Sequence, residues 1–389
     1  MKGENSSEGV LVICLQGIGN TLMTLYAVEK FLETHPARLY LAVSNNGSHE
    51  LALLQAPKDQ VYLWDESKSA TNNILHLGIK LRQTNFNEVY LSYPSGRRES
   101  IIGLLTRATE KKVLMDGVGD WKFFRKLYKS KMTKQSKIHD INANFLLFEI
   151  PNQGFLSSGK VVIEAIRRDY DSYAEQFFSE NSLLGNFVVA LHPGAKGDGK
   201  RWAMEKFIQL CKELNKRVDC KFIIVGGDDE LLLKKAVANG IGGSAVMLNS
   251  SSVIKTASVL RRCNLFIGND SAPMHISAIS GVPVIALWSY TDFYRTAPYG
   301  DGNVIVRKAY DCSPCYSFTD WYKDDCKYHL RCIKDLELDD VLPIVSHCIE
   351  IMLSEKRKVR TGDIHSLKTE GIDRIYALEH GCTVVDLKG

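Results

Sequence analysis

The sequence lacks a long apolar segment near its amino terminus, an internal repeat, a low-complexity tract and a strong net charge. The first apolar run, Val10–Leu15, is only six residues long, too short for the core of a signal peptide or for a bilayer span. Ten cysteines among 389 residues are too sparse for a disulfide scaffold, and several stand singly in apolar stretches, as buried reduced thiols do. We therefore expect a cytoplasmic protein.

The charge is unevenly distributed. The apolar fraction of 45% and the charged fraction of 24% are those of a soluble globular protein, and the net charge is only +4. Between Lys111 and Lys137, however, nine Lys or Arg residues face two Asp, with four aromatic residues interleaved. Such a segment suits an anionic membrane surface or a phosphorylated acceptor; a solvated helix face with core aromatics is the alternative. Nucleic-acid binding is not expected, because the basic excess is confined to this segment and no nucleic-acid motif accompanies it.

Short apolar strands alternate with amphipathic helices in both halves, which predicts an α/β fold with parallel sheets. The length favours two domains and a tail, which we place at 1–165, 166–345 and 346–389. The basic segment up to Asn144 is expected to be irregular. The expected strands are Val10–Leu15, Arg38–Ser44, Gln60–Trp64, Glu88–Tyr93, Phe187–His192, Lys221–Val225 and Leu265–Gly268.

A glycine turn, "QGIGN", follows the first strand and precedes a helix. Such a turn can bind a phosphate on the first amide groups of the helix. It fails as a dinucleotide fingerprint, because Leu22 occupies the third glycine position and no acid ends the second strand. Two interpretations of the turn remain. Its backbone lies close to a ligand, to which Asn20 and Thr21 offer polar groups, or it is a tight turn that only starts the helix.

Two further motifs follow strands of the second half. In "HPGAKGDGKRW", the cations of Lys196, Lys200 and Arg201 lie just beyond a strand's carboxyl end, where ligands bind in open α/β sheets, and they suit a diphosphate. In "VGGDDE" (Val225–Glu230), a carboxylate is placed to hold ribose hydroxyls. The alternative for this second motif is capping of a helix by an aspartate.

The stretch "LFIGNDSAPMHISAISGVPVIALW" contains strand, loop, helix and strand. Ser271 suits the N-cap position and Pro273 the first turn, and Gly281 ends the helix. Asp270 and His275 then lie near the positive end of the helix dipole, which favours a bound anion. Simple helix capping beside one satisfied histidine is the alternative.

Together the motifs resemble glycosyltransferase family 9, the bacterial family that includes the lipopolysaccharide heptosyltransferases. The resemblance covers Val10 to about Leu342 and rests on "GIGNTLMTLYAVEKF", "LHPGAKGDGKRWAMEKF", "IIVGGDDE" and "FIGNDSAPMHISAISGVPVIALWSYTD". It implies a GT-B fold, two Rossmann-like domains with parallel sheets facing across a cleft, with the nucleotide-sugar donor in the C-terminal domain and the acceptor in the N-terminal one. It also implies inversion without a catalytic metal, so that cations and helix amides must meet the charge of the diphosphate.

The resemblance assigns roles residue by residue. Lys200 becomes the main cation, and Glu230 or Asp228 holds the nucleoside. Many members carry a general base where this chain has Asn20, which cannot accept a proton, so the base must come from elsewhere or activity is reduced; Glu99 and Asp116 are the acids that could supply it. The catalytic set is Asn20, Glu99, Lys200 and Asp270; the substrate-binding set is Gly17, Gly19, Thr21, His192, Gly194, Lys196, Arg201, Asp228, Glu230, Ser271, Ala272, Met274 and His275.

Four cysteines, Cys312, Cys315, Cys326 and Cys332, begin with a C-x-x-C pair. The pair is typical of a structural zinc or iron site, although the later spacings match no standard finger. Some members of the resembled family, including relatives that glycosylate autotransporters, carry cysteines here, with a bound iron as precedent. Four plain thiols are the alternative.

The sequence thus predicts a cytoplasmic heptosyltransferase-like enzyme, peripheral at the inner face of the membrane. It would transfer a sugar, heptose from ADP-heptose, to a surface glycolipid resembling the lipopolysaccharide core. A protein or natural-product acceptor remains open. So does a non-catalytic relative that binds a nucleotide-sugar or glycan, because Asn20 replaces the usual acid.

Overall fold

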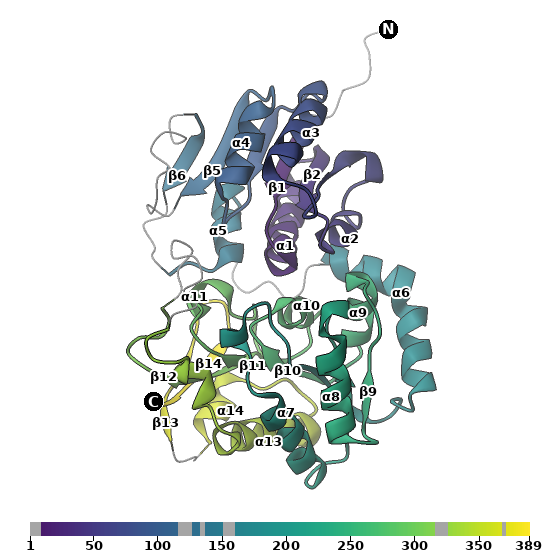
Figure 1. Ribbon diagram of the computed structural model, residues 1–389, viewed down its shortest axis with the longest axis vertical. Helices are drawn as coiled ribbons and strands as arrows, with labels where there is room; N and C mark the ends of the chain where they lie inside the picture. Colours follow the sequence, from purple (N-terminus) through teal and green to yellow (C-terminus); the bar gives the residue numbers. More distant parts are fainter. Residues whose placement is uncertain (1–8, 116–126, 133–136, 151–159, 316–325, 368–370) are drawn as a thin grey trace. The chain divides into compact units, whose positions relative to one another are not determined.

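The computed structural model describes residues 9–115, 127–132, 137–150, 160–315, 326–367 and 371–389. The chain divides into two compact units, one of Met1–Gln153 with Gly159–Ala165 and one of Gly154–Ser158 with Ile166–Gly389. Each unit is built on one sheet (Figure 1). Within the described residues, no helix is both long enough and apolar enough to cross a membrane.

The first unit contains a six-stranded parallel sheet in the order β3-β2-β1-β4-β5-β6. Residues of β1 are all buried, because apolar side chains on both of its faces meet the helices of a parallel sheet. The strands are β1 (Gly9–Cys14), β2 (Arg38–Ser44), β3 (Val61–Trp64), β4 (Glu88–Leu91), β5 (Glu110–Met115) and β6 (Lys129–Met132), and the helices are α1 (Ile18–Thr34), α2 (Ser48–Ala52), α3 (Ala70–Gln83), α4 (Arg97–Leu105) and α5 (Asp140–Leu147).

Strands β5 and β6 lie in the segment that we expected to be irregular, so that expectation was wrong. Charged side chains obscure the strand pattern, yet they are paired across the sheet: Lys112 Nζ lies 2.6 Å from Glu88 Oε1, and Lys129 pairs with Glu110. Tyr128 is buried and its hydroxyl donates to the Ser100 carbonyl at 2.7 Å. Most of the remaining basic-aromatic segment lies outside the described residues.

The second unit contains an eight-stranded sheet in the order β13-β14-β12-β11-β10-β7-β8-β9, parallel except for β13. The strands are β7 (Phe187–His192), β8 (Cys220–Ile224), β9 (Ala245–Met247), β10 (Leu265–Asn269), β11 (Val284–Trp288), β12 (Val304–Ala309), β13 (Ile372–Ala377) and β14 (Thr383–Lys388). The helices are α6 (Lys160–Glu180, beginning in the first unit), α7 (Met204–Asn215), α8 (Leu231–Ile241), α9 (Val253–Leu260), α10 (Ala272–Ile279), α11 (Phe293–Thr296), α12 (Arg331–Lys334), α13 (Leu338–Glu355) and α14 (Thr361–His365).

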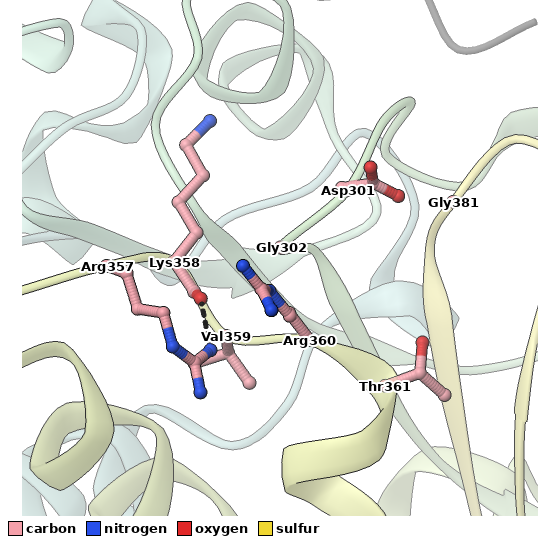
Figure 2. Close-up of a pocket in the computed structure, with 8 residues that line it drawn as sticks. All are labelled: Asp301, Gly302, Arg357, Lys358, Val359, Arg360, Thr361 and Gly381. Carbon is pink, nitrogen blue, oxygen red and sulfur yellow. Dashed lines mark hydrogen bonds between the residues drawn. The ribbon is translucent and has the colours of Figure 1, made fainter. Parts of the chain in front are cut away.

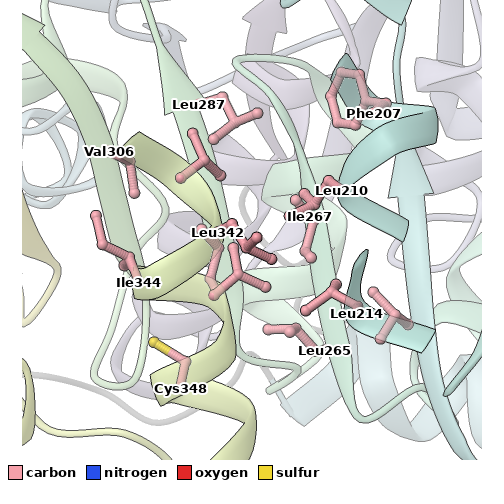
Figure 3. Close-up of a cluster of buried hydrophobic side chains, with 14 of the residues drawn as sticks. Phe207, Leu210, Leu214, Leu265, Ile267, Leu287, Val306, Leu342, Ile344 and Cys348 are labelled. Carbon is pink, nitrogen blue, oxygen red and sulfur yellow. The ribbon is translucent and has the colours of Figure 1, made fainter. Parts of the chain in front are cut away.

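The core of the second unit forms where α7 and α13 cover one face of this sheet (Figure 3). The apolar side chains of α7 lie on one face, since Phe207, Leu210 and Leu214 are all fully buried against strand residues such as Ile267. A buried leucine contributes about 1.5–3 kcal/mol relative to an exposed one. The packing of α7 and α13 holds the strands of this sheet, and therefore their carboxyl ends, in place.

The end of the chain belongs to the same sheet. Strands β13 and β14 pair with each other and extend it beyond β12. Arg307 on β12 lies 3.0 Å from Asp386 on β14, and both side chains are buried. The residues after 346 are therefore part of the second compact unit.

Both sheets place their first strand between the second and fourth in chain order. The first unit reverses direction between β1 and β4, and the second between β7 and β10. In doubly wound folds, ligands bind beyond the carboxyl ends of strands at such a reversal. Each unit therefore has one such edge at which a ligand could bind.

Candidate functional site

An ion pair lies at the reversal point of the second unit. Lys200 Nζ donates to Asp270 Oδ2 at 2.6 Å, and the same oxygen accepts from Thr291 Oγ1 at 2.8 Å. Burial disfavours the charge on Asp270, but the charge and hydrogen bond of Lys200 overcome it and hold the pKa of Asp270 below its ordinary value. A fixed carboxylate and a fixed cation therefore face the space beyond β10.

Backbone around this pair is held by Asn269, the last residue of β10. Its fully buried amide accepts from the Trp202 N–H at 3.0 Å and donates to the carbonyls of Pro193 at 2.9 Å and Gly194 at 3.2 Å. These bonds tie the loop after β7 to the end of β10. The position of Lys200 is consequently set by the sheet rather than by a free loop.

A second set of hydrogen-bonded side chains lies at the same carboxyl edge of the second unit's sheet. His192 Nδ1 lies 2.8 Å from Ser271 Oγ, and His192 Nε2 lies 2.9 Å from Glu230 Oε2. Burial raises the pKa of Glu230, but the hydrogen bond from His192 and the Gly227 N–H keep it below its ordinary value. A Cβ on Gly194 would stand 1.8 Å from Glu230 Oε1, so this position must be glycine for the carboxylate to lie there.

His275 lies one turn into α10, close to the ion pair. Burial lowers its pKa to about 4, against the opposing charge of Asp270, so the ring is neutral at pH 7. Its side chain forms no hydrogen bond to any residue that the structure describes. A buried imidazole is normally satisfied, so His275 retains hydrogen-bonding capacity for a ligand.

The amino end of α10 differs from the expected capping. Ser271 occupies the N-cap position, but its side chain forms no cap hydrogen bond. Instead its hydroxyl donates to the Asn269 carbonyl at 3.1 Å and contacts His192. The expected N-cap position of Ser271 is confirmed, but its hydroxyl does not cap the helix, because β10 ends so close to His192 that the hydroxyl has these partners instead. The first amide groups of α10 are left without a side-chain cap, as an anion site requires.

The other expected residues of this unit differ in their surroundings. Lys196 and Asp228 are exposed, and Arg201 bonds the Ala195 carbonyl and Asp198. Ala272 begins α10, whereas Met274 is fully buried in the core. Of the two acids proposed to bind the nucleoside, only Glu230 therefore takes part in the hydrogen bonds with His192 and the Gly227 N–H.

In the first unit, the glycine turn follows β1 as expected. Gly17 precedes α1, which begins at Ile18, so Gly19 and Asn20 lie in its first turn. A Cβ on Gly17 would meet nothing within 4 Å, which leaves open space beside the turn. Thr21 is buried and donates to Ser48 Oγ at 3.0 Å, so its hydroxyl holds α2 in place.

Glu99 lies in the first turn of α4, and its side chain reaches the residue before that glycine turn. It is fully buried, and its two oxygens accept from the Gly96 N–H at 2.9 Å and from Gln16 Nε2 at 3.0 Å. The carboxylate therefore joins the start of α4 to the residue before the glycine turn. Asp116, the other acid considered as a base, lies outside the described residues.

Sequence reasoning missed an acid at this edge. Glu66, two residues after β3, accepts from Ser44 Oγ at 2.8 Å and lies 3.9 Å from Arg98, and its side chain is 43% exposed. An acid just beyond a strand was the available signal. Thr291 and Asn269 were missed in the second unit because their roles depend on contacts between loops.

The four cysteines lie on either side of a segment outside the described residues, 316–325. Among the described residues, no group of three or more His, Cys, Asp or Glu side chains is placed to hold a metal ion. Burial raises the pKa of Cys332 to about 12, with smaller contributions from the other three thiols, which lie near it. They are free thiols here, and a structural metal on these four cysteines stays a prediction.

Comparison with known proteins identifies the family and the fold. The model of glycosyltransferase family 9 (heptosyltransferase) matches residues 94–324. A lipooligosaccharide heptosyltransferase 2 from Campylobacter jejuni is 27% identical over 232 residues, covering 56% of this chain and 71% of the relative.

Two solved structures from Escherichia coli share the fold. The heptosyltransferase WaaC with ADP-2-deoxy-2-fluoro heptose has a TM-score of 0.65 at 15% identity, covering 87% of this chain and 98% of that one. The ADP-heptose lipopolysaccharide heptosyltransferase II has a TM-score of 0.63 at 15% identity, covering 90% and 100%. The expected GT-B fold class is confirmed. With the family match spanning more than half of the sequence, this chain belongs to glycosyltransferase family 9 and is a glycosyltransferase.

Proposed function

We propose that this glycosyltransferase transfers a heptose from ADP-heptose to a growing surface glycolipid resembling the lipopolysaccharide core. The observation that carries the proposal is the gathering of Lys200, Asp270, His275 and Glu230 at one reversal point of the second unit. The relatives named above are lipooligosaccharide and lipopolysaccharide heptosyltransferases, which supports heptose as the sugar and a lipopolysaccharide as the acceptor.

In the proposed reaction, an acceptor hydroxyl attacks the anomeric carbon while the bond to the diphosphate oxygen breaks, which inverts the configuration. The diphosphate leaves with the electron pair of that bond. Its growing charge is met by Lys200 and by the uncapped amide groups of α10, which act without a metal ion. Glu230 accepts hydrogen bonds from the ribose hydroxyls, and Asp270 and His275 orient the sugar.

The proton of the acceptor hydroxyl requires a carboxylate, because the amide of Asn20 cannot accept it. Glu66 is our candidate for this general base, since 43% of its side chain is exposed and it lies on the carboxyl edge of the first unit's sheet. Glu99 is a weaker candidate, because it is buried and both of its oxygens already accept hydrogen bonds. Asn20 then orients the acceptor. A glycolipid acceptor would also bring the enzyme to the inner face of the membrane.

The test uses the full chain with ADP-heptose and, separately, UDP-hexoses, with a purified lipopolysaccharide-core acceptor. We expect release of ADP and a product of inverted configuration with ADP-heptose alone, unchanged by a chelator. Lys200→Ala should lose turnover, whereas Lys235→Ala, at an exposed position of α8, should retain it. Binding of ADP-heptose without transfer or hydrolysis would contradict the proposal and favour a nucleotide-sugar-binding relative. Turnover of UDP-hexoses would contradict the donor.

A further inference from the structure

A cavity of about 390 Å³ lies in the second unit away from the site described above (Figure 2). Its size falls within the roughly 300–1,000 Å³ of small-molecule sites. Asp301 and Gly302 precede β12, and Gly381 precedes β14, so the cavity lies at the amino ends of these parallel strands. The residues of the proposed donor site follow the carboxyl ends of β7, β8 and β10, so the cavity lies at the opposite edge of the sheet.

One wall is the charged segment that follows α13, residues 356–360, and its backbone is held firmly. Arg357 donates to both oxygens of Asp363, at 2.6 and 2.8 Å, and lies 2.6 Å from Glu355 Oε2. Val359 is buried in the core, and the Arg360 N–H donates to Asp363 Oδ2 at 2.7 Å. Arg357 is thereby neutralised and serves to fix the wall.

Two further cations of the wall, Lys358 and Arg360, line the cavity. Neither the Lys358 amine nor the Arg360 guanidinium forms a hydrogen bond or an ion pair with any residue in the described part of the chain. Both side chains are exposed, and both extend from the wall that Val359 anchors. The charge of Lys358 acts on Asp301 and that of Arg360 on Asp363, without a side-chain hydrogen bond in either case. Two cations on a fixed backbone whose side-chain donors form no hydrogen bond suit an anion with several oxygens, and a phosphoryl group has that form.

The opposite wall carries a carboxylate. Asp301 lies against Gly381, where a Cβ would stand 2.4 Å from Asp301 Oδ1, and a Cβ on Gly302 would stand 3.1 Å from the stem of Lys358. Glycine at both positions therefore leaves room for the carboxylate and the lysine. Asp301 would repel a bare anion but would accept hydrogen bonds from hydroxyl groups. Val359 is the one apolar side chain among the lining residues, which excludes an apolar ligand.

We propose that this cavity is a binding site for a phosphorylated sugar. The phosphoryl group lies against Lys358 and Arg360, and hydroxyl groups of the sugar ring donate to Asp301. The ligand is either a free sugar phosphate or the phosphorylated headgroup of a glycolipid, because both carry the same chemistry. The site is separate from the proposed donor site, and the proposal does not depend on the reaction assigned there.

Calorimetric titration of the full chain tests the proposal with three probes: a hexose 6-phosphate, inorganic phosphate and the unphosphorylated hexose. We expect the hexose 6-phosphate to bind most tightly and the hexose not at all. The double variant K358Q/R360Q should bind it at least about tenfold more weakly. Asp301→Asn should remove the advantage of hexose 6-phosphate over inorganic phosphate.

Two controls separate this site from other phosphate contacts. Lys235→Gln, an exposed cation elsewhere in the same unit, should bind as the wild type does. Lys200→Ala, which alters the proposed donor site, should also leave this binding intact. Thermal unfolding of each variant verifies that it is folded, since these side chains project from a wall fixed by other residues.

Vesicles distinguish the two sources of ligand. Sedimentation with vesicles that contain a phosphorylated inositol lipid, but not with neutral vesicles, assigns the site to a headgroup; titration by the free sugar phosphate alone assigns it to a small molecule. The proposal is overturned if K358Q/R360Q binds the hexose 6-phosphate as tightly as the Lys235→Gln control. It is equally overturned if the wild type shows no binding up to about 10 mM.

Discussion

The Lys200–Asp270 pair provides the most direct test of the site's electrostatics. At 2.6 Å, with an effective dielectric constant of about 20, the Coulomb attraction is about 6 kcal/mol before the cost of desolvation is subtracted. Removal of one partner from a buried pair costs about 3–5 kcal/mol, because the other charge is left buried alone. Lys200 keeps 23% of its side chain exposed, so water reaches it and we expect the lower end of this range. Lys200→Ala should therefore lower the free energy of unfolding by about 3 kcal/mol at pH 7.

A double-mutant cycle identifies the cause of this loss. Asp270→Asn in the Lys200→Ala background removes the orphaned charge and should restore most of the stability. The pH dependence has a defined sign. In the wild type the pKa of Asp270 is lowered, so its contribution is complete above its unfolded value and is lost as the pH falls through the lower, folded value. In Lys200→Ala the carboxyl is expected to protonate readily, so the difference from wild type should shrink below about pH 5.

The assay is denaturant unfolding followed by tryptophan fluorescence, since Trp202 and Trp288 are buried in this unit. Lys235→Ala, a cation on the exposed part of α8, is the matched control and should change stability by less than about 0.5 kcal/mol. If Lys200→Ala behaved as this control does, or if Asp270→Asn brought no recovery, the pair would not be stabilising and the reasoning would be refuted.

Further predictions concern both units. Glu66→Gln should lower kcat of the proposed transfer at least about 100-fold, with the affinity for the donor unchanged. Glu99→Gln should chiefly lower the unfolding temperature. The reverse pattern would make Glu99 the general base and Glu66 the structural carboxylate. Because the pKa of His275 falls to about 4 from 6.5, stability should decrease by about 3 kcal/mol between these pH values, and His275→Gln should flatten that slope in acid unfolding curves. Gly194→Ala should displace Glu230 and weaken nucleotide binding in titrations about tenfold, while Gly243→Ala, whose Cβ meets nothing within 4 Å, should not. The metal hypothesis for the cysteines stays a prediction for elemental analysis of the purified chain, and less than about a tenth of an equivalent of metal would contradict it.

Much of the fold was predictable because the strands are short, apolar and bounded by glycine or charge. Phe187–His192 and Arg38–Ser44 occur with the expected bounds. The prediction failed at β5 and β6, where lysines stand in strands and the apolar pattern is weak. Those lysines are tolerated because carboxylates on neighbouring strands pair with them, and such pairing is a property of the sheet that no local sequence window contains.

The sequence by itself determined the family, the α/β class and the residue types of the candidate site, because strand ends and glycine loops are local features. Only the tertiary structure decided which of those residues lie together. It joined Lys200 to Asp270 across 70 positions of the chain, linked Glu230 to Ser271 through His192 and withdrew Ser271 from capping α10. It also buried Glu99 and left Glu66 exposed. Hydrogen bonds between loops have no sequence period, because they arise only when parallel strands bring their carboxyl ends to one edge.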